Sequence, residues 1–190
     1  MRHPPALAIP LLWAAWAVCW MIASAFAKPV RRRESAASRA SHMVPLAVGA
    51  ALLASRRLAG AVLDARFLPR WPTWLWLGTT LVAAGLLFSA AARMRLGGNW
   101  SGTVTLKQGH TLTCSGPYRV VRHPIYSGML LAVLGTAMAE GEWRGLVAFA
   151  AVLAAFLRKV RIEERFMLEA FGEEYARYQR EVPALVPWVV

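Results

Sequence analysis

Residues 115–128, which read SGPYRVVRHPIYSG, are the polar stretch around which the rest of the chain is arranged. The Gly-Pro pair near its start predicts a turn, because glycine accepts unusual backbone angles and proline fixes φ. Pro124 suits the first turn of a helix, where its missing N–H costs no hydrogen bond, so we expect His123 to precede that helix and Tyr126 to lie in its first turn. Free backbone N–H groups there would favour an anionic ligand group. The alternative is a polar connector that only starts a helix.

The composition is that of an integral membrane protein. Hydrophobic residues make up 57% of the 190 positions and charged residues only 17%, with nine Trp, which is far from a soluble average. The formal net charge of +12 is compatible with nucleic-acid binding, but the arginines lie between apolar runs, as is typical of membrane proteins. Cys19 and Cys114 are isolated and indicate neither a disulfide framework nor a zinc site. We therefore expect no nucleic acid and no metal among the partners.

Apolar segments on both sides of the central stretch predict an all-α bundle of five transmembrane helices, because about 20 apolar residues cross the hydrocarbon core. The expected spans are residues 6–27, 43–63, 73–92 and the two halves of the apolar run 128–157, which is broken near Gly141. A cleaved signal peptide is the alternative for the first span. Arg56 and Arg57 interrupt the second span, and we expect them to snorkel to the outer interface.

The positions of the basic residues predict a multi-pass topology. Of the 22 Lys and Arg residues, 16 lie in the loop after the first span, in the polar segment 93–127 and in the tail beyond residue 157. The positive-inside rule then places the N-terminus outside and the C-terminus in the cytoplasm. We divide the chain into residues 1–92, which hold three spans, and residues 93–190, which hold the loop, a short helical hairpin and a C-terminal amphipathic helix.

The sequence pattern of the C-terminal tail indicates that it packs against the central loop. Residues 158–180 have helical periodicity, with one apolar stripe and a charged back. Glu163 and Glu164 lie on the flanks of that stripe, so their carboxylates are either paired locally or face a ligand. The 35-residue polar segment 93–127 is too long for an idle connector. We therefore expect a site on the cytoplasmic side where the loop and the tail meet.

Three separated blocks of this region resemble the isoprenylcysteine carboxyl methyltransferase family. The blocks are HTLTCSGPY at 110–118, RHPIYSG at 122–128, and a tail pattern that runs from Glu163-Glu164 through FGEEY at 171–175 to Val182-Pro183. The match covers about residues 93–190 and keeps the blocks in order. That family is part of a wider group of integral membrane methyltransferases that includes phospholipid N-methyltransferases.

The resemblance implies a cytoplasmic site for S-adenosylmethionine, formed by the loop and the tail. The cofactor contacts that it implies are His110, Thr111, Leu112, Thr113, Tyr118, His123, Pro124, Ile125, Tyr126 and Glu163. In the family an Arg one turn before the matching Glu is associated with substrate. Lys159 occupies that position here with Arg158 beside it, so both are candidate substrate-binding residues. Arg122 and Glu164 are the candidate catalytic residues, acting in chemistry or in positioning.

The implied function is methyl transfer to a lipophilic acceptor that enters from the membrane lipid. Displacement at a sulfonium methyl depends mostly on positioning. A carboxylate acceptor needs no base, whereas an amine must lose a proton, for which Glu163 or Glu164 would serve. Carboxyl O-methylation of an isoprenylcysteine-like or prenylated acceptor is the first hypothesis. N-methylation of a lipid amine or another small lipophilic acceptor is the second, and a non-catalytic membrane relative is the third. No Rossmann glycine fingerprint supports a nicotinamide enzyme.

Overall fold

The computed structural model describes residues 4–55, 60–109 and 111–187. Its long helices are α1 (Pro4–Ser24), α2 (Ala36–Ala54), α4 (Pro72–Leu96), α5 (Pro124–Glu140) and α6 (Trp143–Phe171). The shorter elements are α3 (Gly60–Leu63), α7 (Glu173–Glu181), the 3-10 turns η2 (Gly97–Asn99) and η3 (Gly116–Arg119), and the strands β1 (Val30–Arg33) and β2 (Thr105–Lys107). The predicted helical fold is thus confirmed, with one small sheet added.

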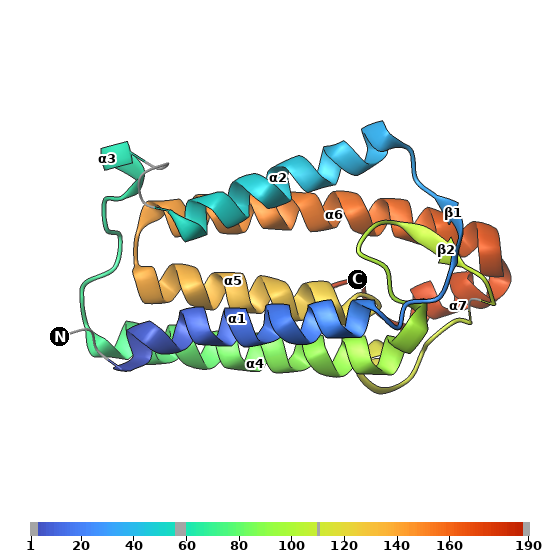
Figure 1. The fold of residues 1–190 in the computed structure, drawn as a ribbon, viewed down its shortest axis with the longest axis horizontal. Coiled ribbons are helices and arrows are strands. Elements are labelled where there is room, and N and C mark those ends of the chain that lie inside the picture. The colour runs from blue at the N-terminus through green and yellow to red at the C-terminus, as the bar shows by residue number, and fades with distance from the viewer. Residues whose placement is uncertain (1–3, 56–59, 110, 188–190) are drawn as a thin grey trace.

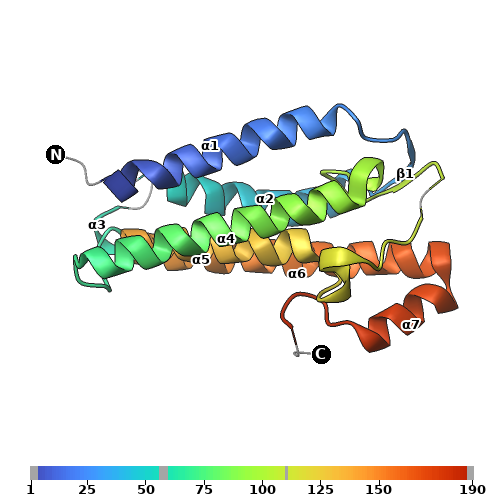
Figure 2. The same cartoon turned by 90° about the horizontal axis from the view of Figure 1, so that it is seen from below.

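The five long helices run side by side (Figures 1 and 2). α4 packs along α5, α2 packs along α6, α5 contacts α6, and α1 lies on α4. The two strands and α7 gather at one end of the bundle, where α1 and α4 end and α2 and α5 begin (Figure 1). The polar segments that the sequence separates widely are therefore brought together at a single end.

Close packing of α4 against α5 fixes where the central stretch enters the bundle. A methyl group added at Gly85 would collide with the Gly128 carbonyl oxygen, and one added at Gly78 would collide with the carbonyl of Gly135. Small residues let two helical backbones approach in this way. The start of α5 is therefore held firmly against the last turns of α4.

The predicted spans are confirmed in part. Among the described residues, two helices, covering 7–24 and 72–99, are long and apolar enough to cross a membrane, and α5 is a shorter apolar helix. A single span over residues 43–63 is wrong: α2 begins earlier, because the Ser35 hydroxyl accepts from the Ser38 N–H at 3.2 Å, and it ends at Ala54. Arg56 and Arg57 lie outside the described residues.

The hairpin after α4 forms as expected, but the tail does not begin a new helix. α5 ends at Glu140, and the positive φ of 64° at Gly141 suits a left-handed C-cap. α6 then continues without a break from Trp143 to Phe171, so the predicted helix from residue 158 is the second half of α6. Gly172, with a φ of 52°, separates α6 from α7.

The sheet corrects the purely helical prediction. β1 and β2 pair antiparallel, with Arg33 opposite Thr105. The pairing is anchored by Glu34, whose carboxylate accepts the Val104 N–H at 3.1 Å. On the same side, the Lys28 ammonium donates to the Asn99 side-chain oxygen at 3.0 Å. These contacts hold residues 99–105 against the loop that follows α1, an arrangement that no local periodicity indicates.

Candidate active site

The start of α5 has the predicted form. His123 is the N-cap residue and Pro124 the first residue of the helix. The backbone N–H of Arg122 donates to the Pro183 carbonyl at 2.8 Å, and that of His123 donates to the Ala184 carbonyl at 3.0 Å. The C-terminal segment therefore takes up the two N–H groups that precede the helix, and an anion held by the N–H groups of the helix itself stays a prediction.

The same C-terminal segment fastens the loop at two further points. The Ser127 hydroxyl donates to the Leu185 carbonyl at 2.5 Å, and the Tyr178 hydroxyl donates to the Tyr118 carbonyl at 2.6 Å. α7 and the residues after it thus lie across the central stretch. The loop and tail meet as predicted, but the contact is made largely by backbone carbonyls that sequence cannot reveal.

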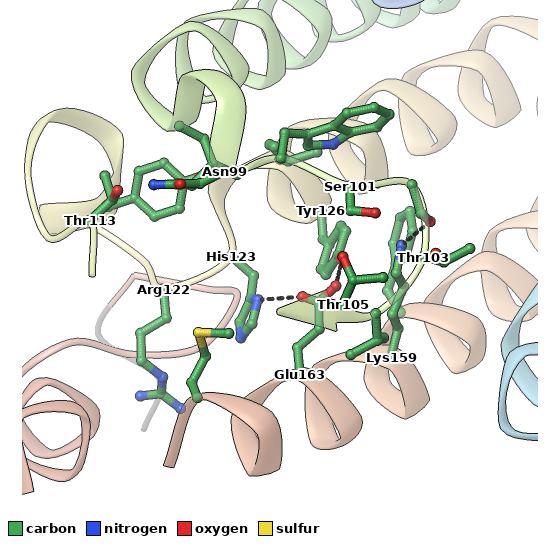
Figure 3. A pocket seen from close by; sticks show the side chains of 18 of the residues that line it. Asn99, Ser101, Thr103, Thr105, Thr113, Arg122, His123, Tyr126, Lys159 and Glu163 are labelled. Atoms are coloured by element: carbon green, nitrogen blue, oxygen red, sulfur yellow. Dashed lines mark hydrogen bonds and ion pairs between the residues drawn. The ribbon is translucent and has the colours of Figure 1, made fainter. Parts of the chain in front are cut away.

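Glu163 joins the start of α5 to α6. Its carboxylate accepts the Tyr126 hydroxyl at 2.5 Å and lies 3.5 Å from Nδ1 of His123. Tyr126 in turn stacks on Phe156, with ring centroids 4.6 Å apart. Figure 3 shows His123, Tyr126 and Glu163 converging on one another. The carboxylate is thus held in one place by two groups from a different helix.

Glu164 has a different set of partners. One of its oxygens lies 2.8 Å from Nε of Arg122 and 3.2 Å from Nε2 of His123, and the other accepts from the Gln179 amide at 3.1 Å. Arg122 also donates to the backbone carbonyls of Gln179 and Val182. The two predicted catalytic residues therefore contact each other and tie the loop to the tail.

Hydrogen bonds shift the pKa values of His123, Glu163 and Glu164. All three residues lie outside the apolar part of α6. Burial alone would lower the pKa of His123, but hydrogen bonds to Glu163 and Glu164 outweigh it and raise the pKa. Burial alone would raise the pKa of Glu163, but the His123 hydrogen bond and the charge of Lys159 lower it. The pKa of Glu164 is lowered in the same way by His123 and Arg122. The two carboxylates on either side of the imidazole therefore favour its protonated form.

A cavity of about 260 Å³ lies beside this cluster. Its charged end is formed by Glu163, His123, Arg122 and Lys159. Its other end is lined by apolar side chains from four helices: Trp16, Trp20, Leu46, Met129 and Phe156. The cavity thus extends from the polar end of the molecule to the interior of the bundle.

Most of the predicted site residues line this cavity. Those that do are Leu112, Thr113, Tyr118, Arg122, His123, Ile125, Tyr126, Lys159 and Glu163. Thr111, Pro124 and Glu164 are not among the residues that line the cavity. Thr111 accepts a hydrogen bond from the side chain of Asn99, which does line it. Arg158 is exposed away from the cavity and donates to the Ser41 hydroxyl at 3.2 Å. His110 lies outside the described residues.

Lys159 is the basic residue of α6 that reaches the cavity. Its side chain is 7% exposed. Its ammonium donates to the Gly102 carbonyl at 2.9 Å and lies 5.2 Å from the centre of the Tyr126 ring. Of the two adjacent candidates for substrate binding, the structure thus brings Lys159 to the cavity and leaves Arg158 outside it.

Other cavity residues were missed by sequence reasoning. Residues 99–105 form one wall, and the Thr105 hydroxyl there is buried with no hydrogen-bond partner among the described residues. Trp16 and Trp20 of α1 stack, with centroids 4.3 Å apart, and both face the cavity. Their spacing of four residues on one helix face was a usable signal. For residues 99–105 the decisive contacts are long-range, and the sequence offers no equivalent signal.

The fold and the cavity define a helical membrane protein with a binding site that is charged at one end and apolar at the other. A family model described as phospholipid methyltransferase matches residues 73–174, more than half of the chain. The chain therefore belongs to the phospholipid methyltransferase family. The match covers α4, the central loop, α5 and α6, the elements that surround the charged end of the cavity.

Individual relatives confirm the resemblance to the isoprenylcysteine methyltransferases. Protein-S-isoprenylcysteine O-methyltransferase B of Arabidopsis thaliana is 29% identical over 129 residues, covering 65% of this chain and 66% of the relative. The protein-S-isoprenylcysteine O-methyltransferase of Schizosaccharomyces pombe is 32% identical over 108 residues, covering 55% of this chain and 46% of the relative.

A solved structure shares the fold. The eukaryotic intramembrane Ras methyltransferase, isoprenylcysteine carboxyl methyltransferase, superposes with a TM-score of 0.52 at 27% identity, covering 63% of this chain and 46% of that chain. The present chain thus spans between about half and two thirds of the length of the relatives it matches.

Proposed function

We propose that this protein is an S-adenosylmethionine-dependent methyltransferase that methylates the carboxylate of a lipophilic, isoprenylcysteine-like acceptor within the membrane. The observation that carries the proposal is the single cavity with Glu163, His123 and Lys159 at one end and an apolar wall at the other. Such a shape suits two reactants, one polar and water-borne and one lipophilic. In this proposal the charged end faces the cytoplasm, because most Lys and Arg residues lie in the segments at that end.

The residues of the cavity fit the cofactor. Its ammonium group needs a carboxylate, which Glu163 offers, and its adenine needs an aromatic or apolar wall, which Tyr118 and Trp100 provide. The buried Thr105 hydroxyl has no hydrogen-bond partner in the described part of the chain and borders the cavity, so it is available to a ligand. When bound, S-adenosylmethionine supplies an electrophilic methyl group on a sulfonium.

The chain's own residues contribute position and charge to this reaction. His123 and the Tyr126 hydroxyl hold Glu163 toward the cavity. Arg122 and Glu164 fasten the loop to the tail, so they act as positioning residues in this proposal. Lys159 places a positive charge beside the reacting end, which favours an anionic acceptor. A carboxylate acceptor is already ionised and requires no base.

The apolar wall explains the choice of a lipophilic acceptor. Trp16 and Trp20 of α1, Leu46 of α2 and Met129 of α5 extend the cavity into the bundle. An isoprenoid chain that lies against these side chains would gain about 25 cal/mol of binding free energy for each Å² of apolar surface removed from water. The carboxylate at the end of that chain would then reach Lys159.

N-methylation of a lipid amine is the second candidate. Glu163 supports it, because a carboxylate beside the cavity is able to accept the proton that an ammonium must lose. Lys159 opposes it, because a like charge disfavours a cationic acceptor at the same end. The two candidates therefore predict opposite responses to removal of the Lys159 charge.

The test combines an acceptor panel with a charge substitution. Purified protein in nanodiscs is assayed for transfer of labelled methyl groups to prenylcysteine analogues and to lipid amines. We expect labelling of the prenylcysteine carboxylate, and we expect Lys159→Gln to raise KM for it roughly ten- to a hundredfold, as for the loss of a charge-assisted contact. Arg161→Gln, on an exposed position of the same helix, is the matched control.

The alternatives give distinct results in the same assay. Labelling of the amine alone, with Lys159→Gln equal to or faster than wild type, would replace the carboxylate by an amine acceptor. Binding of S-adenosylmethionine without transfer to any acceptor would leave the non-catalytic relative.

A further inference from the structure

A second hollow, of about 280 Å³, lies outside the candidate active site. It is formed by β1, the first turn of α2 and the last third of α6. Figure 1 shows these three elements meeting at the end of the bundle that carries the polar segments. Three arginines from two elements line the hollow, Arg32 and Arg33 of β1 and Arg165 of α6.

The two carboxylates of the hollow are already engaged by the protein. Glu34 is buried, accepts hydrogen bonds from Ser38 and the Val104 N–H, and lies 2.9 Å from Nε2 of His42. Glu169 pairs with Arg32 at 2.5 Å. Neither carboxylate is therefore available to neutralise the remaining arginines.

Arg33 and Arg165 are left with uncompensated charge. Both are exposed, and neither forms an ion pair with a carboxylate of the described residues. The Arg32 guanidinium is held 4.6 Å from the centre of the Phe166 ring. The Ser35 hydroxyl at the start of α2 accepts the Ser38 N–H and donates to no group of the described residues, so its proton is available to a ligand in the hollow. The group that matches these donors is a phosphate.

The position of the hollow along the helices decides between kinds of phosphate. The apolar part of α6 ends at Leu157, and the basic residues Arg158, Arg161 and Arg165 follow within two turns. Arg158 contacts Ser41 of α2, and the hollow begins about one helical turn beyond this contact. This is the depth at which a helix leaves the hydrocarbon and meets the headgroups.

We propose that this hollow binds the phosphodiester headgroup of an anionic phospholipid. Arg33 and Arg165 contact the phosphate, the Ser35 hydroxyl donates to it, and the acyl chains follow the apolar surface of α2 and α6. Basic clusters at the cytoplasmic boundary of a membrane helix attract anionic lipids by their charge. Here the hollow adds a defined place for one headgroup, and the inference does not rest on the proposed methyl transfer.

The hollow is connected to the candidate active site through one residue pair of the β1–β2 sheet. Arg33 lies opposite Thr105 in the β1–β2 pairing, and Thr105 lines the first cavity. A headgroup bound at Arg33 would therefore hold the strand that forms a wall of that cavity.

The test measures lipid retention by the intact chain. Wild-type protein in phosphatidylcholine nanodiscs with a minor fraction of phosphatidylglycerol is released and examined by native mass spectrometry. We expect one phosphatidylglycerol to remain bound per chain, and we expect the double variant Arg33→Gln/Arg165→Gln to lower its retention roughly tenfold. The control Arg31→Gln/Arg161→Gln removes the same charges from the same two elements outside the hollow and should retain the lipid.

Three results would overturn the proposal. Equal loss in both double variants would mean that diffuse surface charge attracts the lipid. Equal retention by wild type and Arg33→Gln/Arg165→Gln would remove the hollow from lipid binding. Displacement of phosphatidylglycerol by millimolar inorganic phosphate would mean that a soluble phosphate is the ligand. If the double variant does not fold, the exposed single substitution Arg165→Gln against Arg161→Gln makes the same comparison.

Discussion

Two buried clusters of charges lie along α6, and they differ in their relation to the candidate active-site cavity: Glu163 and His123 line it, whereas the residues around Arg144 do not. Near the start of α6, the Arg144 side chain is 4% exposed and pairs with Glu140 at 2.9 Å and Glu142 at 2.7 Å. It also donates to the carbonyls of Leu52 and Leu53 at the end of α2. This arginine thus satisfies backbone acceptors that a helix end leaves open.

The cluster around Glu163 also combines basic side chains with carboxylates, but one of its carboxylates borders the cavity. His123 lies between Glu163 and Glu164, and Arg122 holds Glu164. Glu164 faces the C-terminal tail, whereas Glu163 borders the cavity. Buried charge alone therefore does not mark a candidate active site. The distinguishing feature is a charged atom that is fixed by neighbours and still borders open space.

The largest effect should come from the cluster around Arg144, which lies apart from the candidate active site. Replacing Arg144 by Ala removes the partner of three carboxylates, those of Asp64, Glu140 and Glu142, and of two carbonyls. Breaking a buried pair in this way costs about 3–5 kcal/mol. We expect the thermal midpoint in detergent to fall strongly, while the folded fraction binds S-adenosylmethionine as before. Arg161→Ala, at an exposed position, should change stability by less than about 0.5 kcal/mol. Weakened cofactor binding at unchanged stability would erase the contrast between the two clusters.

The next largest effect should come from Glu163, where we expect a loss of cofactor affinity rather than of stability. Glu163→Gln removes the carboxylate that borders the cavity, and loss of a charge-assisted hydrogen bond costs about 1.5–3 kcal/mol, or roughly ten- to a hundredfold in cofactor affinity. Calorimetry with S-adenosylmethionine or its demethylated product measures this.

Glu164→Gln provides the comparison for that measurement. Because the Glu164 oxygens contact Arg122, His123 and Gln179, we expect its substitution to lower stability more than cofactor affinity. If it weakened the cofactor as strongly as Glu163→Gln, the two carboxylates would share the binding role.

The sequence predicted the parts of this contrast that depend on local rules. Pro124 placed the start of α5, Gly141 placed the hairpin, and the flanking position of Glu163 indicated a carboxylate that was either paired or facing a ligand. Each of these follows from the conformational limits of one residue or from helical periodicity. The resemblance then indicated which loop residues would gather around it.

Other parts depend on contacts that are distant in sequence and were not predictable. The carbonyls of Pro183 and Ala184 accept the backbone N–H groups just before α5. Residues 99–105 form a wall of the cavity through contacts with Lys159 and Glu34. Lys159 and Arg158 are neighbours in sequence, yet one reaches the cavity and the other contacts Ser41. That difference is set by where α2 and the loop lie around α6, which the pattern of α6 alone does not contain.

The smallest effect concerns the proton on His123. Its pKa is raised in the folded protein by Glu163 and Glu164, despite the burial that acts against it. The stabilisation from this proton is therefore complete below the ordinary histidine pKa of about 6.5 and is lost as the pH rises through the higher folded value. We expect an effect on the order of 1 kcal/mol, read as a thermal midpoint measured from acidic to alkaline pH.

His123→Asn isolates that proton from the helix start. His123 makes no side-chain capping bond to α5, and Asn is itself a favourable N-cap residue, so the helix start should survive the change. Wild type should exceed the variant in stability at low pH, and the difference should shrink as the pH rises, because neutral imidazole no longer offsets the two carboxylates. A difference that stays constant would mean that the ring acts by packing alone. A difference that grows with pH would mean that His123 is neutral in the folded protein, and the protonated bridge between Glu163 and Glu164 would then be wrong.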